Sequence, residues 1–251
     1  MPKKKKKKKK KASFVLSSVL ALLLVAAVVL VVAYTFLLSF AERTAAESIQ
    51  DRLGLESSPG VELESDSPLS LLAGEFSGGH ISIEDAQFGG VRAESVAIDL
   101  DPFDVSVLES ARTGALRSEE PLSGTLRVGI PEEEAARLAR VGADVPVRGV
   151  ELHRDGVIVR SAAPVLEIPV SIRGNLLLRG KELVFEPQRV EALGSAVPEG
   201  LAERAFAGTH YFAYPLEGLP YGAKISDVEV QEGRLVLIGG VQRMPIGPPS
   251  G

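Results

Sequence analysis

The feature that most constrains this chain is a run of nine lysines, Lys3–Lys11, followed by thirty residues, 12–41, without a charged side chain. A membrane-spanning helix needs about 20 apolar residues, and Phe14–Phe40 exceeds that length. Charges at the bilayer centre cost a few kcal/mol each, so their absence favours a membrane span. By the positive-inside rule, we expect a single-pass cell-membrane protein with a cytoplasmic N-terminus and an extracytoplasmic C-terminal part.

A cleaved secretory signal peptide is the main alternative, because Ser39 and Ala41 are small residues at the positions that a signal peptidase reads. A signal peptide's apolar region spans only about 7–15 residues, roughly half the length found here. We therefore favour an uncleaved anchor. The lysine run could also be read as a nucleic-acid patch, but lysines beside a span are better explained by attraction to anionic lipids.

The part of the chain after residue 41 is strongly acidic. It carries all 33 acidic residues, whereas nine of the 28 basic residues lie in the lysine run and 19 remain, an excess of about 14 negative charges. Such a domain repels phosphate backbones, so no nucleic-acid partner is expected. Cysteine is absent, and stability must therefore come from packing without disulfides.

Composition shifts divide the chain into five segments. Residues 42–54 contain helix formers without Gly or Pro until Gly54, which predicts a helical stalk. The predicted segments are a cytoplasmic polylysine tail (1–11), a transmembrane anchor (12–41), the helical stalk (42–54), a β-rich domain (55–246) and a disordered tail (247–251).

Beyond the stalk the apolar residues alternate with polar ones, which predicts strands with one apolar face. The alternation occurs at residues 61–63, 95–100, 125–130, 157–159, 168–172, 176–178, 183–185 and 228–230. Turn residues bound these runs, and turns are expected at 154–156, 173–175, 179–181 and 231–233. The pattern predicts a mainly β (α+β) domain of antiparallel hairpins.

Helix signals are few. Pro131 followed by three glutamates, with Gly142 at the end, predicts a short amphipathic helix. Two further helices are expected at 67–73 and 199–207. These helices are too few to cover the apolar sheet faces, so the sheet either closes as a barrel or sandwich, or curls around a helix and leaves an apolar groove.

Two stretches of the sequence together resemble a known family. The first contains Leu71, Leu72, Gly74 and Phe76 before a strand; the closing stretch contains Pro220, Gly222, Val228, Val230, Gly233, Leu235 and Val236. Over roughly residues 50–242 the chain resembles the LmeA family of actinobacterial phospholipid-binding proteins. The resemblance implies a curved antiparallel sheet wrapped around a helix, similar to tubular lipid-binding domains, with phospholipid and membrane as partners and a role in the cell envelope.

If the apolar faces line an acyl-chain site, its wall is formed by the matched leucine-rich turn and the inward positions of the alternating strands. The candidate lipid-lining residues are Leu71, Leu72, Phe76, Val96, Ile98, Leu100, Val157, Val159, Val170, Ile172, Leu176 and Leu178. Aliphatic residues in this pattern are equally typical of an ordinary packed core, which is the alternative for the same positions.

No catalytic, metal or cofactor motif is evident. GxSxG, HExxH and glycine-rich phosphate loops are absent, and His80, His153 and His210 lie far apart. The most catalytic-looking cluster is Asp99, Asp101 and Asp104, which is better explained by acids collecting at a turn where a strand ends at Pro102 than by a calcium site. We therefore predict a non-catalytic phospholipid-binding protein, with an envelope scaffold that binds a protein partner, or a lipid-processing enzyme, as alternatives.

Overall fold

The computed structural model describes residues 6–88, 90–113, 116–118, 120–143, 146–162, 168–198, 200, 212–216, 219 and 222–244. The predicted helix at 199–207 lies outside these residues except for Gly200, and the predicted tail 247–251 and the first five residues also lie outside them. The described part is mainly β, with antiparallel sheets and few helices, as the alternation predicted.

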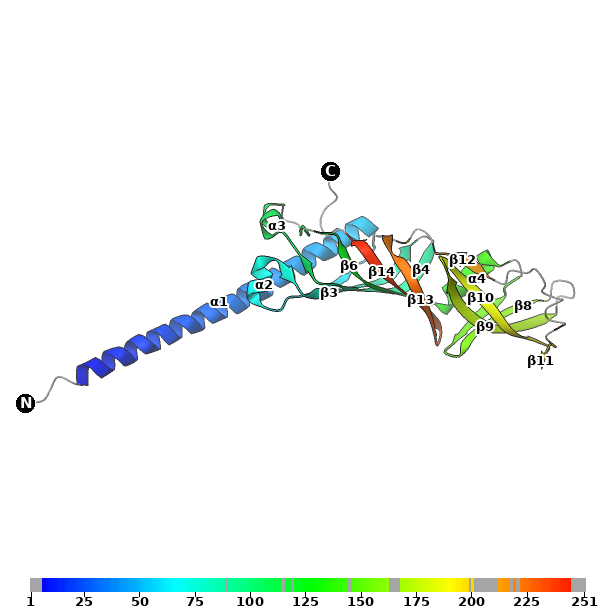
Figure 1. Ribbon diagram of the computed structural model, residues 1–251, viewed down its shortest axis with the longest axis horizontal. Helices are drawn as coiled ribbons and strands as arrows, with labels where there is room; N and C mark the ends of the chain where they lie inside the picture. Colours follow the sequence, from blue (N-terminus) through cyan, green and yellow to red (C-terminus); the bar gives the residue numbers. More distant parts are fainter. Residues whose placement is uncertain are drawn as a thin grey trace, which may run out of the picture.

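The longest element is α1 (Lys6–Leu53), a single helix that joins the predicted anchor and the predicted stalk without a break. Figure 1 shows its N-terminal part projecting beyond the rest of the molecule. Large apolar side chains such as Leu22 and Phe36 are exposed along this part, whereas Ala41, Ala45 and Ile49 are buried in the core. The helix therefore changes from an exposed rod to a packed element near residue 41.

A search of the described residues for a helix with the length and apolar character needed to cross a membrane finds none. The assignment of residues 12–41 to the membrane stays a prediction.

The first sheet has six strands and covers the end of α1. Each strand pairs with its neighbour in antiparallel fashion. In spatial order the strands are β1 (Gly60–Glu64), β3 (Gly78–Phe88), β4 (Val91–Leu100), β6 (Leu122–Pro131), β14 (Arg234–Met244) and β13 (Lys224–Gln231).

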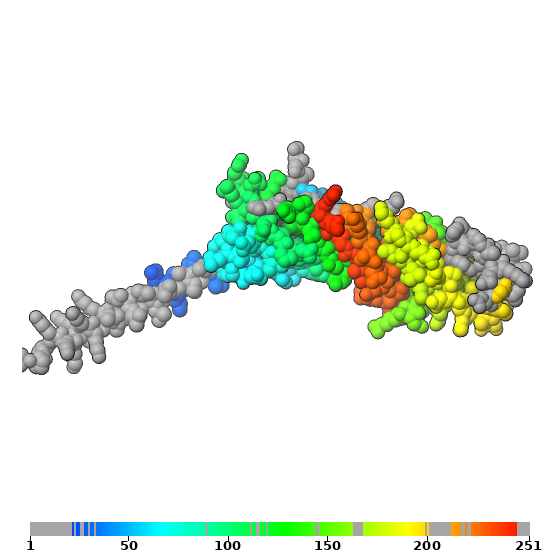
Figure 2. Space-filling view, in the orientation of Figure 1, coloured from blue at the N-terminus to red at the C-terminus, as the bar shows by residue number. Residues whose placement is uncertain are grey.

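The second sheet is formed by hairpins from the middle of the chain. Its order is β11 (Ser195–Ala196), β10 (Glu182–Ala192), β9 (Pro169–Arg179), β8 (Gly156–Ala162) and β7 (Gly149–His153), and β12 (Ala213–Pro215) also pairs with β10. Figure 2 shows β13 and β14, in orange and red, between the green strands of the first sheet and the yellow strands of the second. Contacts between β13 and β9 join the two sheets at this point.

One predicted turn is wrong. Residues 173–175 lie inside β9, which is a continuous strand, so the predicted strands 168–172 and 176–178 are one element. The close approach of the strands leaves no room for a side chain at Gly174, because a Cβ at this position would clash with the carbonyl oxygen of Glu186. A bulge in β10 opposite it, between Pro187 and Arg189, accompanies this close approach.

Two of the short helices in the described residues follow their sequence signals closely. In α2 (Pro68–Ala73), the Ser67 hydroxyl accepts a hydrogen bond from the Ser70 N–H, and Gly74 ends the helix with φ 88°. A third helix, α3 (Val107–Thr113), has no counterpart among the predicted helices. The predicted helix after Pro131 is α4 (Glu132–Gly142), with Pro131 at its N-cap.

The core is one apolar cluster shared by both sheets. It includes the buried end of α1, the inward side chains of the strands, and Ala135, Leu138 and Ala139 of α4. Helix α4 therefore occupies the same core as the strands of both sheets.

A small two-stranded sheet is formed by β2 (Glu75–Phe76) and β5 (Phe103–Asp104), and the rings of Phe76 and Phe103 stack with their centres 4.9 Å apart.

Candidate functional site

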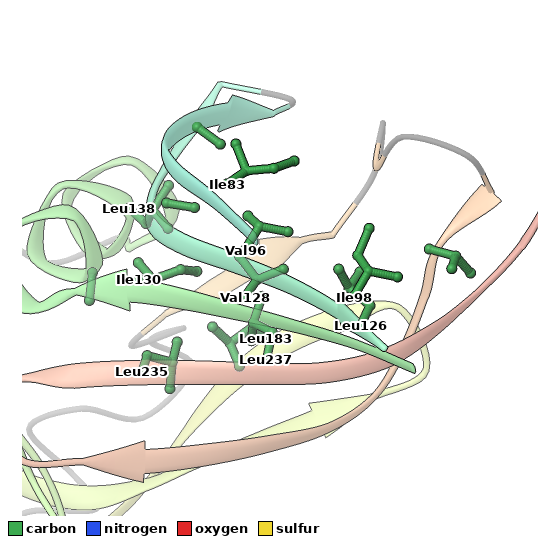
Figure 3. Packing of buried hydrophobic residues seen from close by; sticks show 14 of the residues in the cluster. Ile83, Val96, Ile98, Leu126, Val128, Ile130, Leu138, Leu183, Leu235 and Leu237 are labelled. Carbon is green, nitrogen blue, oxygen red and sulfur yellow. The ribbon is translucent and has the colours of Figure 1, made fainter. Parts of the chain in front are cut away.

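An apolar cleft lies between the first sheet, the end of α1, α4 and β10 of the second sheet. The unfilled space between its walls, including the open mouth, is ≈ 700 Å³. The strands supply most of the wall, and Figure 3 shows Val96, Val128 and Leu237 directed into the interior from β4, β6 and β14. The other lining residues are Leu53, Ile83, Phe88, Val91, Ala93, Ile98, Leu126, Ile130, Leu138, Leu183, Leu216, Leu219 and Val241.

A second apolar compartment lies beside the cleft under the second sheet, and its unfilled space, including open solvent, is ≈ 350 Å³. Leu138 of α4 and Leu183 of β10 line both compartments, so the two compartments lie side by side with these residues as their shared wall. Little of either volume is wide enough for a water molecule, which shows that the walls lie close together. The arrangement suits a flexible, chain-shaped apolar ligand that takes up the space between side chains.

The structure places five of the twelve sequence-predicted lining residues in this cleft. Val96 and Ile98 line the first compartment, and Val157, Val159 and Leu176 line the second. Leu178 lines a neighbouring open cavity. The five are brought together from β4, β8 and β9, which are far apart in the sequence.

The remaining predicted residues lie elsewhere in the described structure. Leu71, Phe76, Leu100, Val170 and Ile172 are buried in the core but do not line the two apolar compartments. The side chain of Leu72 is 51% exposed on α2.

Several wall residues were not predicted. Leu126, Val128 and Ile130 were recognised as one strand face, and that signal could have placed them in the wall. Leu138 was not predicted as a wall residue, because the sequence of an amphipathic helix does not reveal which sheet its apolar face contacts. Phe88 and Val91 flank a hairpin, and their position depends on the register between β3 and β4.

The cleft opens toward a wider cavity whose unfilled volume is ≈ 1070 Å³, including open solvent. Leu216 and Leu219 line both spaces. Among the described residues that line the wider cavity, charge is carried by Lys181 and Lys224 alone.

A buried carboxylate fixes α4, and hence Leu138, against the first sheet. The Glu134 carboxylate accepts the backbone N–H of Arg92 in β4 at 2.8 Å and the Arg137 guanidinium at 2.7 Å. Arg137 also donates to the carbonyl of Gly90. The hydrogen bond from Arg137 is the main reason that the pKa of Glu134 lies below its ordinary value, despite opposition from burial.

The first residue of α4 makes the matching contact with the second sheet. The Glu132 carboxylate accepts the backbone N–H of Leu152 in β7 at 2.8 Å. The sequence predicted only that these acids favour the helix N-terminus. The structure adds that two of them attach α4 to different sheets, which sets the helix between the two compartments.

The polar cluster nearest to the predicted acidic turn lies on the outer face of the first sheet. Asp99 accepts hydrogen bonds from His80 at 2.7 Å and from Arg127 at 2.5 Å. The pKa of Asp99 is lowered, first by the hydrogen bond from His80. Asp101 instead accepts a hydrogen bond from Ser123. Within the described ranges, no group of three or more His, Cys, Asp or Glu residues could hold a metal ion.

The other histidines do not join this cluster. His153 contacts Glu232 at 3.1 Å at the β7–β8 turn, and His210 lies outside the described residues. The described titratable clusters are therefore separate from the cleft wall, which consists of apolar side chains.

A mainly antiparallel domain with a cleft lined by aliphatic side chains has the kind of lining that suits an apolar ligand. A family model described as LmeA-like phospholipid-binding matches residues 32–240. The chain belongs to this LmeA-like phospholipid-binding family, which confirms the resemblance found in the sequence. Comparison with curated proteins and with solved structures gives no match.

Proposed function

We propose that this protein is a membrane-anchored, extracytoplasmic phospholipid-binding protein that holds acyl chains in the apolar cleft and acts in maintenance of the cell envelope. The observation that carries the proposal is the cleft itself, whose two neighbouring apolar compartments share Leu138 and Leu183 as lining residues. Membership of a phospholipid-binding family supports the same ligand class. A curved sheet packed against helices, as in tubular lipid-binding domains, is part of this proposal.

The binding energy in this proposal comes from the lipid tails. Each methylene group moved from water into an apolar site contributes about 0.8 kcal/mol. About ten buried methylene groups therefore contribute about 8 kcal/mol before the costs of association and of parting the walls. Aliphatic walls supply no group that distinguishes one tail from another, so selectivity must come from outside the two apolar compartments.

A non-catalytic role is also part of the proposal. The wall of the cleft offers no nucleophile, acid or base, because its described lining residues are Leu, Ile, Val, Ala and Phe. The His80–Asp99 pair lies on the outer face of the sheet and is about half exposed. A lipid-processing enzyme would require such groups beside the bound lipid.

Anchoring by residues 12–41 is supported by the uncharged sequence and by the exposed apolar side chains of α1. Val28, Val29, Val31 and Val32 are each more than half exposed, whereas the same helix is buried from Ala41 onward. Large contiguous apolar surfaces are rare on soluble monomers and mark contact with a membrane or a partner. A lipid bilayer is the cover that also explains the preceding lysines.

The full-length protein, extracted in mild detergent and washed, is expected to retain about one diacyl phospholipid per chain, because one pair of acyl chains would bury its methylene groups against the aliphatic walls once these part. Native mass spectrometry measures the added mass, and lipid extraction identifies it. If the washed protein carries no phospholipid and takes none up from vesicles, the cleft is a packed core. The alternative of an envelope scaffold with a protein partner then takes the place of this proposal.

Protease added to intact spheroplasts is expected to digest the C-terminal domain and to spare the lysine run, because the positive-inside rule keeps the lysines in the cytoplasm. Immunoblots against tags at the two ends measure this, and permeabilised spheroplasts are the control in which both tags disappear. Recovery of a mature chain that begins at Glu42 would contradict the anchor and establish a cleaved signal peptide.

A further inference from the structure

The wider cavity beside the cleft differs from the rest of the domain in its charge. The sequence after residue 41 contains 33 acidic residues but only two lysines, Lys181 and Lys224. Both lysines line this cavity, with Gly180, Gly222, Leu216 and Leu219. The two lysines that follow residue 41 therefore line the same cavity.

The fold brings these lysines together from different sheets. Lys181 lies in the turn between β9 and β10, and Lys224 begins β13, which contacts β9. The carbonyl of Lys181 accepts the backbone N–H of Leu216 at 2.8 Å, which holds the shared wall beside the lysine. Both lysines are exposed, and neither forms an ion pair with another described residue.

The cationic cavity and the apolar cleft share Leu216 and Leu219, so one amphipathic molecule can occupy both. In a glycerophospholipid the phosphate lies a few bonds from the start of the acyl chains. An ammonium group is a compact charge with three donors and is well suited to a phosphate. From this juxtaposition we propose that Lys181 and Lys224 form the phosphate-binding site for a phospholipid whose tails lie in the cleft.

This inference rests on the proposed function and adds the part of the lipid that the aliphatic walls cannot recognise. The cavity is wide and open, so the substituent beyond the phosphate stays in solvent. The site therefore selects phospholipids over neutral diacylglycerol, and it distinguishes poorly among phospholipid headgroups.

The other open polar cavity does not offer this chemistry. It is lined by Arg92, Arg137 and Arg140 together with Asp85, Glu94, Glu133 and Glu134. Arg137 is paired with Glu134, and Arg92 with Asp85. An anion there would meet four carboxylates, and the residues that line the apolar compartments do not include these side chains.

The test compares the full-length parent with the double variant Lys181→Gln/Lys224→Gln. Washed proteins are incubated with vesicles that contain either phosphatidylglycerol or diacylglycerol, and bound lipid per chain is measured by native mass spectrometry. The apparent affinity for phosphatidylglycerol is expected to fall about 25-fold, because each of the two lysines near a lipid phosphate contributes about a factor of five. Uptake of diacylglycerol is expected to stay as in the parent.

Two further variants separate the phosphate site from a general loss of charge. Arg189→Gln removes one positive charge from an exposed position of β10 away from the cavity, and it is expected to bind phosphatidylglycerol like the parent. Lys181→Arg/Lys224→Arg keeps both charges and is expected to restore most of the binding. The melting temperature of every variant is measured, and the exposed lysines are expected to leave it unchanged.

Four outcomes overturn the inference. If the double variant loses both lipids equally, the lysines do not recognise the phosphate. If its binding of phosphatidylglycerol is unchanged, the lysines do not contact the phosphate. The proposed function survives both results. If inorganic phosphate alone raises the melting temperature of the parent as much as the lipid does, the site binds a free anion. A parent that holds neither lipid overturns the proposed function and this inference together.

Discussion

The full-length protein with Ala93→Phe is expected to lose most of its cleft-bound phospholipid while its melting temperature falls less than that of a variant overpacked elsewhere in the core. Ala93 of β4 is 1% exposed and lines the first apolar compartment. A phenyl ring at this position fills space that an acyl chain would otherwise occupy. The measurement pairs bound phospholipid per chain, by native mass spectrometry, with thermal unfolding of the same preparation.

Ala45→Phe is the matched control for this variant. Ala45 is also 1% exposed, but it packs in the core about 12 Å along α1 from Leu53, the described residue of that helix in the cleft wall. Here the added ring meets closely packed neighbours and costs about 1–3 kcal/mol. The control is expected to unfold at a lower temperature and to retain lipid. If both variants melt alike and hold equal lipid, the space beside Ala93 is not an acyl-chain site.

Glu134→Gln is expected to destabilise the protein by about 2 kcal/mol at pH 7, which is a fall of about 4–8 °C in melting temperature for a domain of this size. The substitution keeps the shape of the side chain but removes the charge that pairs with Arg137 and accepts the Arg92 N–H. Glu133→Gln is the control, because Glu133 is the exposed neighbour on the same helix. Equal melting of the two variants would contradict the role of Glu134.

The same carboxylate predicts a pH dependence of stability. Pairing with Arg137 lowers the pKa of Glu134 in the folded state from an ordinary value of 4.5. A lowered folded pKa means that the unfolded state binds the proton more tightly, so the stabilisation is present above about pH 4.5 and is lost as the pH falls through the folded pKa. The difference between the parent and Glu134→Gln is therefore expected to shrink below about pH 4.5.

The elements of this fold could be predicted from local pattern to a large extent. Alternation at 95–100 and 125–130 identified two strands of the first sheet, and Pro131 with its three glutamates identified α4. The error at 173–175 arose because glycine in a strand and glycine in a turn look alike in a single sequence. Only the pairing of β9 with β10 shows that Gly174 is needed for close approach.

The candidate site was less predictable than the strands. Alternation shows that Val96 and Val170 each face inward, but it does not show that only Val96 meets the cleft. Leu138, Lys181 and Lys224 acquire their places from the way in which α4, β9 and β13 meet. That arrangement depends on long-range contacts such as the Glu134 hydrogen bond to β4, for which the sequence offers no local signal.

The continuity of α1 has a consequence for geometry. Over Lys6–Leu53 the helix has no break, and its last turns are fixed in the core from Ala41 onward. Each residue of a helix advances the chain by about 1.5 Å and rotates it by about 100°. If residues 12–41 lie in the bilayer as proposed, the rise of the helix sets the height of the cleft above the membrane. The rotation of the helix sets the direction in which the mouth of the cleft faces. Under the proposed anchoring, the proposed lipid site is held at a fixed distance and angle from the membrane, without the freedom of a protein tethered by a flexible linker.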